Sequence, residues 1–208
     1  LFTGAEMAGI KFHGAIDTVI SRNHIYRSGN IGIWLDWMTQ GTRVTGNLLH
    51  DNGNLLYNNS ADLLVETNHG PFLVDNNIFL SGKSLLDYSH GGAYVHNLVA
   101  GSMRVAHVEH RKTPYHKAHS TEVVELDGNP SGDDRYYNNI FVQRYVSQSD
   151  IGRNGLTLYD PAKLPVFMGG NVFLKGAKPC KHEQNPFVRS NFDPGIKLVE
   201  KPDGLYLQ

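Results

Sequence analysis

Two carboxylates and two tryptophans carry the clearest chemistry in this sequence. Asp36 stands between Trp34 and Trp37, and Glu66 follows an apolar run. A pair of carboxyl groups can cleave a glycosidic bond, because one attacks the sugar or activates water while the other donates a proton. Aromatic rings beside such a pair offer an apolar surface to a sugar ring. This chemistry requires a fold that places Asp36 beside Glu66.

A repeat along the chain predicts such a fold. An Asn followed by apolar residues recurs at Asn23, Asn47, Asn77, Asn97, Asn139 and Asn171. The first four copies are 24, 30 and 20 residues apart. A spacing of about twenty residues, with short β-branched strands and Asn or Gly at the corners, is typical of a parallel β-helix. Asn at a corner tolerates left-handed backbone and can bond its stacked copy, so we assign these residues a structural role.

Counting back from the corner Asn residues aligns one polar side chain on each coil. The aligned side chains, each 10 or 11 residues before an Asn, are His13, Asp36, Glu66 and Asp87. Equivalent side chains of an in-register stack form a column, so Asp36 and Glu66 are expected on adjacent rungs, roughly 5 to 6 Å apart. A separation of about 5 to 5.5 Å suits a retaining glycosidase, whereas an inverting enzyme needs about 6.5 Å or more.

Two other points bear on this column. By strand alternation Trp34 shares the face of Asp36, and Trp37 faces the other way unless a turn intervenes.

Stacked like charges raise the pKa of one carboxyl, which can keep it protonated as a general acid. The alternative interpretation is a solvated polar face on which both acids are ordinary surface carboxylates.

The composition limits the classes of function. The chain has 208 residues and a formal net charge of −1, which gives no electrostatic case for binding nucleic acid or an acidic membrane surface. The single cysteine, Cys180, excludes an intrachain disulfide. We find no signal-peptide pattern and no apolar run long enough to cross a bilayer, so a soluble protein is expected and its compartment is left open.

The order of these features divides the chain into two parts. We expect the parallel β-helix over residues 1–178, with a long loop excursion at about 105–135. Residues 179–208 lose the repeat and are predicted to form a linker and the start of a further β-rich unit. Because the sequence opens at Leu1 in mid-pattern and ends as a strand begins, we interpret the chain as part of a longer protein.

The motifs around the two acids resemble a known family. They are Gly32-Ile33-Trp34-Leu35-Asp36-Trp37, Asp62-Leu63-Leu64-Val65-Glu66, Asn68-His69-Gly70-Pro71 and Val74-Asp75-Asn76-Asn77, with residues 40–43, 111–117 and 132–139. Over residues 6–139 the chain is similar to glycoside hydrolase family 120, whose members include β-xylosidases acting on xylobiose and short xylo-oligosaccharides. Residues 52–61 form a longer connection than is usual there, and an insertion at a coil corner could reshape a sugar subsite.

The resemblance implies a fold and a mechanism. The fold is a right-handed parallel β-helix with an associated β-sandwich, and the mechanism is retaining. Asp36 is then the nucleophile and Glu66 the general acid/base. The resemblance also makes a homo-oligomer plausible. No cofactor is required, and the expected partner is an oligosaccharide substrate.

Further residues are candidates for substrate binding. Glu6 and His13 precede Asp36 by one coil and could hold sugar hydroxyls, while His69 could orient Glu66 or touch the substrate. Arg111 and His116 lie in the excursion and could close over the groove, and at least one of Trp34 and Trp37 could supply an apolar platform for a sugar ring. Glu6 could instead be a solvated edge, and the two excursion residues an exposed loop.

A metal site is a weaker interpretation of the excursion. The candidate ligands are His107, Glu109, His110, His116 and His119. This set matches no zinc signature, so no metal is predicted.

Two rival functions stay open. A polysaccharide lyase also fits a β-helix, but it must neutralise a uronate, and only Lys11 and Arg43 lie near the acidic column. A non-catalytic carbohydrate-binding solenoid would bind sugar without Asp36 and Glu66 and would not turn it over. The sequence does not distinguish xylose from arabinose or other sugars.

Overall fold

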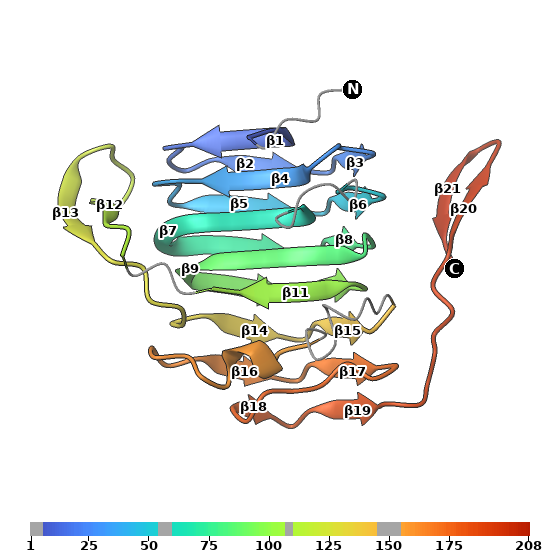
Figure 1. Cartoon of the computed structure of the whole chain (residues 1–208). Helices are drawn as coiled ribbons and strands as arrows, with labels where there is room; N and C mark the ends of the chain where they lie inside the picture. Colours follow the sequence, from blue (N-terminus) through green and yellow to red (C-terminus); the bar gives the residue numbers. More distant parts are fainter. Residues whose placement is uncertain (1–5, 54–59, 107–109, 145–154) are drawn as a thin grey trace.

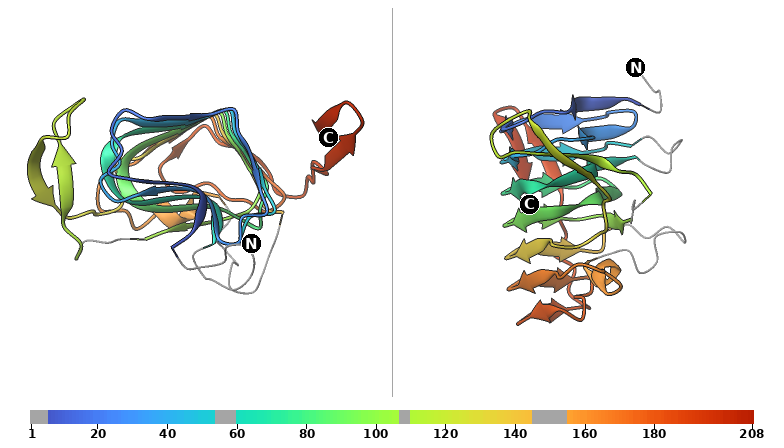
Figure 2. Two further views of the ribbon diagram at one scale, coloured as in Figure 1. Left: turned by 90° about the horizontal axis from the view of Figure 1, so that it is seen from above. Right: turned by 90° about the vertical axis from the view of Figure 1, so that its left-hand side faces the viewer.

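Stacked coils of short parallel strands form the body of the protein. The computed structural model describes residues 6–53, 60–106, 110–144 and 155–208. The coils run from β1 (Ala8–His13) at one end to β18 (Glu183–Gln184) and β19 (Phe187–Arg189) at the other (Figure 1). Viewed along the stack they superimpose on one another (Figure 2). No α-helix occurs in the described ranges, which confirms the predicted all-β class, and η2 (Thr157–Tyr159) is a short 3₁₀ turn.

Two parallel sheets make up the walls of the coils. The ten-stranded sheet contains β1, β2 (Val19–Ser21), β4 (Ile31–Asp36), β5 (Thr42–Thr45), β7 (Ala61–Asp75), β9 (Lys83–Val95), β11 (Ser102–Val105), β14 (Arg135–Tyr137), β16 (Phe167–Gly169) and β18. The seven-stranded sheet contains β3 (His24–Tyr26), β6 (Leu48–His50), β8 (Ile78–Phe79), β10 (Leu98–Val99), β15 (Ile140–Val142), β17 (Val172–Leu174) and β19.

The long strands β7 and β9 pass around one corner of the coil. The first part of β7 pairs with β4, and its last part pairs with β5. β9 follows β7 around the same bend, in parallel register from Leu63↔Leu85 to Asp75↔Val95. Pairing of each coil with the next, wall by wall, is consistent with the predicted parallel β-helix.

Alternate side chains of each strand point into the coil and stack from one rung to the next. Ile33 and Leu35 of β4 lie beside Leu63 and Val65 of β7, and Leu85 of β9 continues the stack, each at most 1% exposed. The side-chain period of two along a strand separates this interior row from an outer row, which carries the polar column.

The predicted Asn ladder runs along one corner of the stack. The Asn77 side-chain oxygen accepts hydrogen bonds from the Asn47 backbone N–H at 3.0 Å and its amide at 2.9 Å, and Asn97 does the same for Asn77. Glu183 ends the ladder by accepting from Asn171. The left-handed conformation belongs to the residue before each Asn, such as Asn76 with φ 55°, and not to the ladder Asn itself.

We predict that Asn77→Ala destabilises the protein by about 2 to 4 kcal/mol, because it removes the acceptor of the buried Asn47 N–H and the amide bond to the Val44 carbonyl. Asn23→Ala is the matched control. Asn23 stands at the open end of the same ladder and donates to Asn47 and Ser21. Denaturant unfolding of the two variants measures the difference. Equal losses would show that the ladder does not stabilise through its buried middle.

The prediction for Asp87 is wrong. The register pairs Val65 with Asp87 and Glu66 with Tyr88, so Tyr88 takes the outer position and Asp87 points into the coil. There its carboxylate accepts hydrogen bonds from the hydroxyls of Tyr94 at 2.8 Å and Tyr159 at 2.7 Å. Burial raises the pKa of Asp87 to about 6. The register partner of Glu66 is Tyr88, which lies 9 residues before Asn97, whereas Glu66 lies 11 residues before Asn77, so β9 is two residues shorter around the bend. A count of 10 therefore falls on Asp87, next to Tyr88, and neighbouring residues of a strand point to opposite faces.

Two hairpins project from the coils. β12 (Thr113–His116) and β13 (Val123–Asp127) form an antiparallel hairpin within residues 105–135, and β20 (Leu198–Lys201) and β21 (Gly204–Leu207) form another near the C-terminus (Figure 1). Parallel coil pairing extends beyond the expected boundary at residue 178, because β18 and β19 pair with β16 and β17.

Among the described residues, no helix is long and apolar enough to cross a membrane.

Candidate active site

Asp36 and Glu66 occupy neighbouring rungs on the outer face of the ten-stranded sheet. His13 pairs with Asp36, and Leu35 pairs with Val65, so Glu66 follows at the position next to Asp36. Neighbouring strands are about 4.8 Å apart, which brings the two carboxyl-bearing rungs together. Counting residues back from the ladder Asn therefore aligned this pair correctly.

The Asp36 carboxylate is almost fully buried and strongly hydrogen-bonded. One oxygen accepts from the Trp37 backbone N–H at 2.8 Å. The other lies 3.1 Å from the Lys11 ammonium and 3.2 Å from His13 Nδ1. Burial raises the pKa of Asp36, but these three contacts outweigh it and hold the pKa below its usual value. The group is therefore ionised near neutral pH, the state that a nucleophile needs.

Glu66 is held by two donors from different parts of the chain. The indole N–H of Trp34 donates to one oxygen at 3.1 Å, and the guanidinium of Arg111 lies 2.6 Å from the other. The Glu66 side chain is 17% exposed, so the group can be reached from solvent. Trp34 itself is only 5% exposed, and the Lys11 ammonium lies 3.6 Å from the centre of its ring. Trp34 therefore supports the pair and is not an open platform for a sugar.

Trp37 does face the site, because a turn intervenes after β4. The strand ends at Asp36, and Met38 adopts φ 60°. The Trp37 ring then stacks on His13 with centroids 6.3 Å apart and receives the Arg111 guanidinium 4.4 Å from its centre. Trp37, rather than Trp34, supplies a partly exposed aromatic surface beside the acids.

Lys11 is the residue whose role the sequence interpretation missed. It bridges Asp36 and Glu6, whose carboxylate lies 2.7 Å from the same ammonium. Burial lowers the pKa of Lys11, but hydrogen bonds to these two acids raise it above its usual value. The alternation of side chains along a strand could have identified Lys11, because it stands two residues before His13 and therefore lies on the same face.

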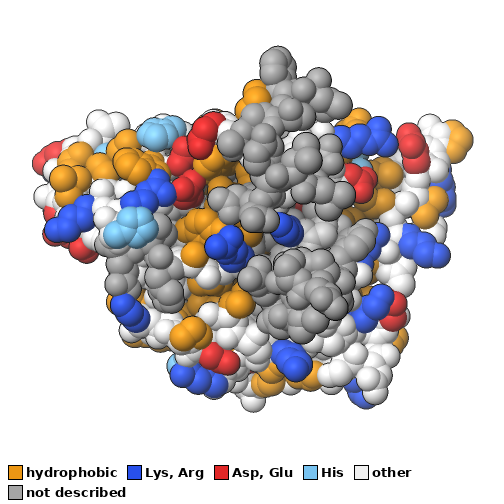
Figure 3. Space-filling view, viewed as in Figure 1, with side chains coloured by type: hydrophobic (Ala, Val, Ile, Leu, Met, Phe, Trp, Pro, Cys, Tyr) orange, Lys and Arg blue, Asp and Glu red, His pale blue; other side chains and the backbone are white. Residues whose placement is uncertain are grey.

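The excursion is tied to the coils on the side of the two acids. Beyond Arg111, Gln40 exchanges two hydrogen bonds with the backbone of His116, and His119 lies 2.9 Å from Asp17. The β12–β13 hairpin therefore lies beside the coils on this side of the molecule (Figures 1 and 2). On the face shown in Figure 3, basic, acidic and hydrophobic side chains gather next to one another toward the hairpin.

Two predicted binding residues lie away from the acids. His69 is 3% exposed and contacts His90 and Thr113 around the bend of β7. His116 is 6% exposed, and its Nδ1 lies 3.3 Å from the Thr121 carbonyl. Both residues take part in the contacts between hairpin and coil, His69 with Thr113 and the His116 backbone with Gln40.

The remaining candidates are placed as follows. Glu6 is exposed and reaches the site through Lys11. His107 and Glu109 of the metal interpretation, and most of the long connection at 52–61, lie outside the described residues. Among the residues that are described, no group of three His, Cys, Asp or Glu side chains could hold a metal ion.

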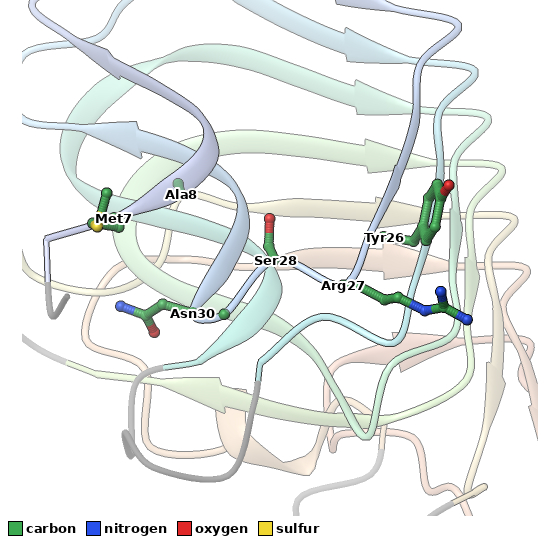
Figure 4. A pocket seen from close by; sticks show the side chains of 7 residues that line it. Met7, Ala8, Tyr26, Arg27, Ser28 and Asn30 are labelled. Atoms are coloured by element: carbon green, nitrogen blue, oxygen red, sulfur yellow. The ribbon is translucent and has the colours of Figure 1, made fainter. Parts of the chain in front are cut away.

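A small cavity at the N-terminal coil is separate from the acids. It has a volume of about 250 Å³ and is lined by Met7, Ala8 and residues 26–30. Figure 4 shows the Met7 and Asn30 side chains on one side of it, and those of Tyr26 and Arg27 on the other. It adjoins the start of β4, whereas Asp36 ends that strand, so it is not part of the candidate active site.

Comparison with known proteins identifies one similar solved structure. It is described as the complex structure of XylC with xylose, and it shares 38% sequence identity with this chain at a TM-score of 0.85. The match covers 98% of this chain and 34% of that one, so the chain spans about a third of that protein's length. No family model and no curated protein match the sequence. The chain is thus similar, over nearly its whole length, to part of a protein whose structure holds xylose.

Proposed function

We propose that the protein is a retaining glycoside hydrolase, most simply a β-xylosidase that removes xylose from short xylo-oligosaccharides. The observation that carries the proposal is the pairing of an ionised, fully hydrogen-bonded Asp36 with a partly exposed Glu66 on the next rung. Similarity to a structure with bound xylose supports the choice of sugar. The resemblance to glycoside hydrolase family 120 supports the retaining mechanism.

The two acids would act in two steps. Asp36 attacks the anomeric carbon and forms a glycosyl ester, while Glu66 protonates the departing oxygen. Glu66 then removes a proton from water, which displaces Asp36 and restores the original anomeric configuration. Arg111 would be drawn from Glu66 as substrate enters, because the leaving-group oxygen must approach the same carboxyl. Trp37 would offer its ring to the sugar.

We also infer that the coil is right-handed and leads into a β-sandwich beyond the described coils. Crossovers between parallel strands of one sheet are right-handed in nearly all proteins. The β20–β21 hairpin would then belong to that further β-rich unit.

The test is hydrolysis of nitrophenyl β-D-xyloside, with arabinosides and glucosides alongside, followed by NMR of the first sugar product. Release of β-xylose before mutarotation supports retention, whereas α-xylose contradicts it. Activity that requires calcium and generates an unsaturated uronate would favour a lyase. Sugar binding without turnover, retained in Asp36 and Glu66 variants, would favour a carbohydrate-binding solenoid.

Lys11→Met is predicted to move the acidic limb of the kcat/KM pH profile to higher pH. The Lys11 ammonium lowers the pKa of Asp36, so its loss lets the nucleophile take up a proton at a higher pH. Lys117→Met is the control, because Lys117 pairs with Glu122 on the exposed hairpin. An acidic limb that stays in place would show that Lys11 does not keep Asp36 ionised.

A further inference from the structure

A second cavity lies around the bend of β7 from the two acids. Its volume is about 440 Å³, and its walls come from coil and hairpin together. The residues that matter here are His69, His90, Tyr115, Asp133 and Arg135. Neither Asp36 nor Glu66 lines it, and no role has been assigned to it so far. It is nevertheless large enough for a sugar unit, and all its lining residues are described.

The two histidines form a neutral wall. His90 Nδ1 lies 3.2 Å from the Pro130 carbonyl, which can only accept, so this nitrogen carries the proton. His90 Nε2 lies 3.0 Å from His69 Nδ1, and His69 Nε2 lies 3.1 Å from the Thr113 carbonyl and 2.8 Å from the Thr113 hydroxyl, which donates to the Thr67 carbonyl. Burial lowers the pKa of both rings. All four ring nitrogens are engaged, which disfavours a metal ion as the ligand.

The open edge of the pocket carries one positively and one negatively charged side chain. Arg135 lies 3.0 Å from Asp133, and their side chains are 42% and 47% exposed. The pair has no net charge, and neither do the two histidines at neutral pH, so the pocket does not select an anion or a cation. It does offer a donor and an acceptor side by side, the combination that a sugar hydroxyl satisfies.

Tyr115 adds an aromatic surface to this rim. It is 37% exposed and sits edge-on to His69 with ring centroids 6.0 Å apart. A tyrosine ring held at an open rim can stack on the apolar face of a sugar while its hydroxyl stays hydrated. An aromatic surface beside a neutral pair of donor and acceptor fits a neutral, polyhydroxylated ligand.

We propose that this pocket binds a neutral sugar unit of an oligosaccharide, at a site separate from Asp36 and Glu66. The identity of the sugar, xylose, rests on the proposed function. One segment links the two sites, because Arg111 contacts Glu66 and Tyr115 follows it by four residues. Four residues of extended chain span about 13 Å, so the same oligosaccharide chain can approach both sites.

The experiment titrates xylose and xylotetraose into the Glu66→Ala protein by calorimetry and by NMR. The added substitutions are Tyr115→Ala and, separately, Arg135→Met. Each is expected to weaken tetraose binding at one of two sites by about tenfold and to leave the other unchanged. Tyr137→Ala is the matched control, because Tyr137 is a 40% exposed tyrosine on β14 that does not line the pocket.

Melting temperatures confirm that each variant is folded. In the otherwise unaltered protein, Tyr115→Ala should keep nitrophenyl xyloside hydrolysis within about twofold of wild type, since the change is outside the acid pair. Unchanged tetraose binding in both pocket variants would overturn the proposal, as would a preference for glucuronate over neutral sugars. So would a failure of the parent protein to bind oligosaccharides of xylose, arabinose or glucose.

The two proposals fail separately. If the wild-type protein cleaves no xyloside but Tyr115→Ala abolishes binding of a neutral oligosaccharide, the proposed function fails and the pocket assignment stands. If xylosides are cleaved while both pocket variants bind normally, the pocket assignment fails alone.

Discussion

Glu66→Ala is expected to lower kcat/KM for xylobiose on the order of 10³-fold, because the departing sugar oxygen loses its proton donor. A nitrophenyl group leaves without protonation, so the first step with nitrophenyl xyloside should suffer much less. The glycosyl-enzyme would then accumulate, since water also loses its general base. A burst of nitrophenol followed by slow turnover is the expected record in stopped-flow absorbance.

Added azide gives a second test of the role of Glu66. The Ala side chain leaves room where the carboxyl stood, and azide needs no general base to attack the glycosyl-enzyme. Turnover of Glu66→Ala should therefore recover with added azide, and NMR should identify β-xylosyl azide. Glu125→Ala on the exposed β13 strand is the control and should behave as wild type. A Glu66→Ala protein that cleaves xylobiose at the wild-type rate would remove Glu66 from the mechanism.

Asp36→Asn is expected to reduce activity on the order of 10⁴-fold or more with every substrate, including nitrophenyl xyloside. An amide is not a nucleophile for the anomeric carbon, so neither a burst nor a β-xylosyl azide should form. The shape of the site is kept, because the amide oxygen can still accept from the Trp37 N–H. Its NH₂ group, however, would meet the Lys11 ammonium, which can only donate.

The stability of that variant must be separated from its chemistry. Asp75→Asn is a suitable control, because Asp75 is also buried and pairs with Arg43 at 2.8 Å on another part of the coil. Both variants lose an ion pair, so comparable melting temperatures with activity lost only in Asp36→Asn would place the effect in catalysis. Residual activity above a hundredth of wild type would contradict a covalent role for Asp36.

The sequence alone predicted the stacked coils and the neighbouring positions of Asp36 and Glu66. The Asn repeat predicted stacked coils because a corner that must satisfy buried backbone groups at every turn uses the same residue each time. Counting from that ladder put His13, Asp36 and Glu66 on successive rungs, as the register shows. Local spacing suffices for such neighbours, since each coil copies the path of the last.

Tertiary structure decided which way several side chains point. Between the rung of Glu66 and the ladder Asn, β9 is two residues shorter than β7, so a count of 10 back from Asn97 falls on the interior-facing Asp87 and not on Tyr88. Trp37 reaches the site because the backbone at Met38 turns into the left-handed region. The spacing of residues in the sequence does not show that a residue other than Gly adopts a left-handed backbone conformation.

The tertiary structure alone also brought distant residues to the acids. Arg111 meets Glu66 across 45 residues, because the excursion doubles back along the coils and is pinned there by Gln40. The length and composition of that excursion predicted a loop but not its path. Its position is set by contacts between side chains and backbone on separate coils, and the same path forms the second pocket around Tyr115.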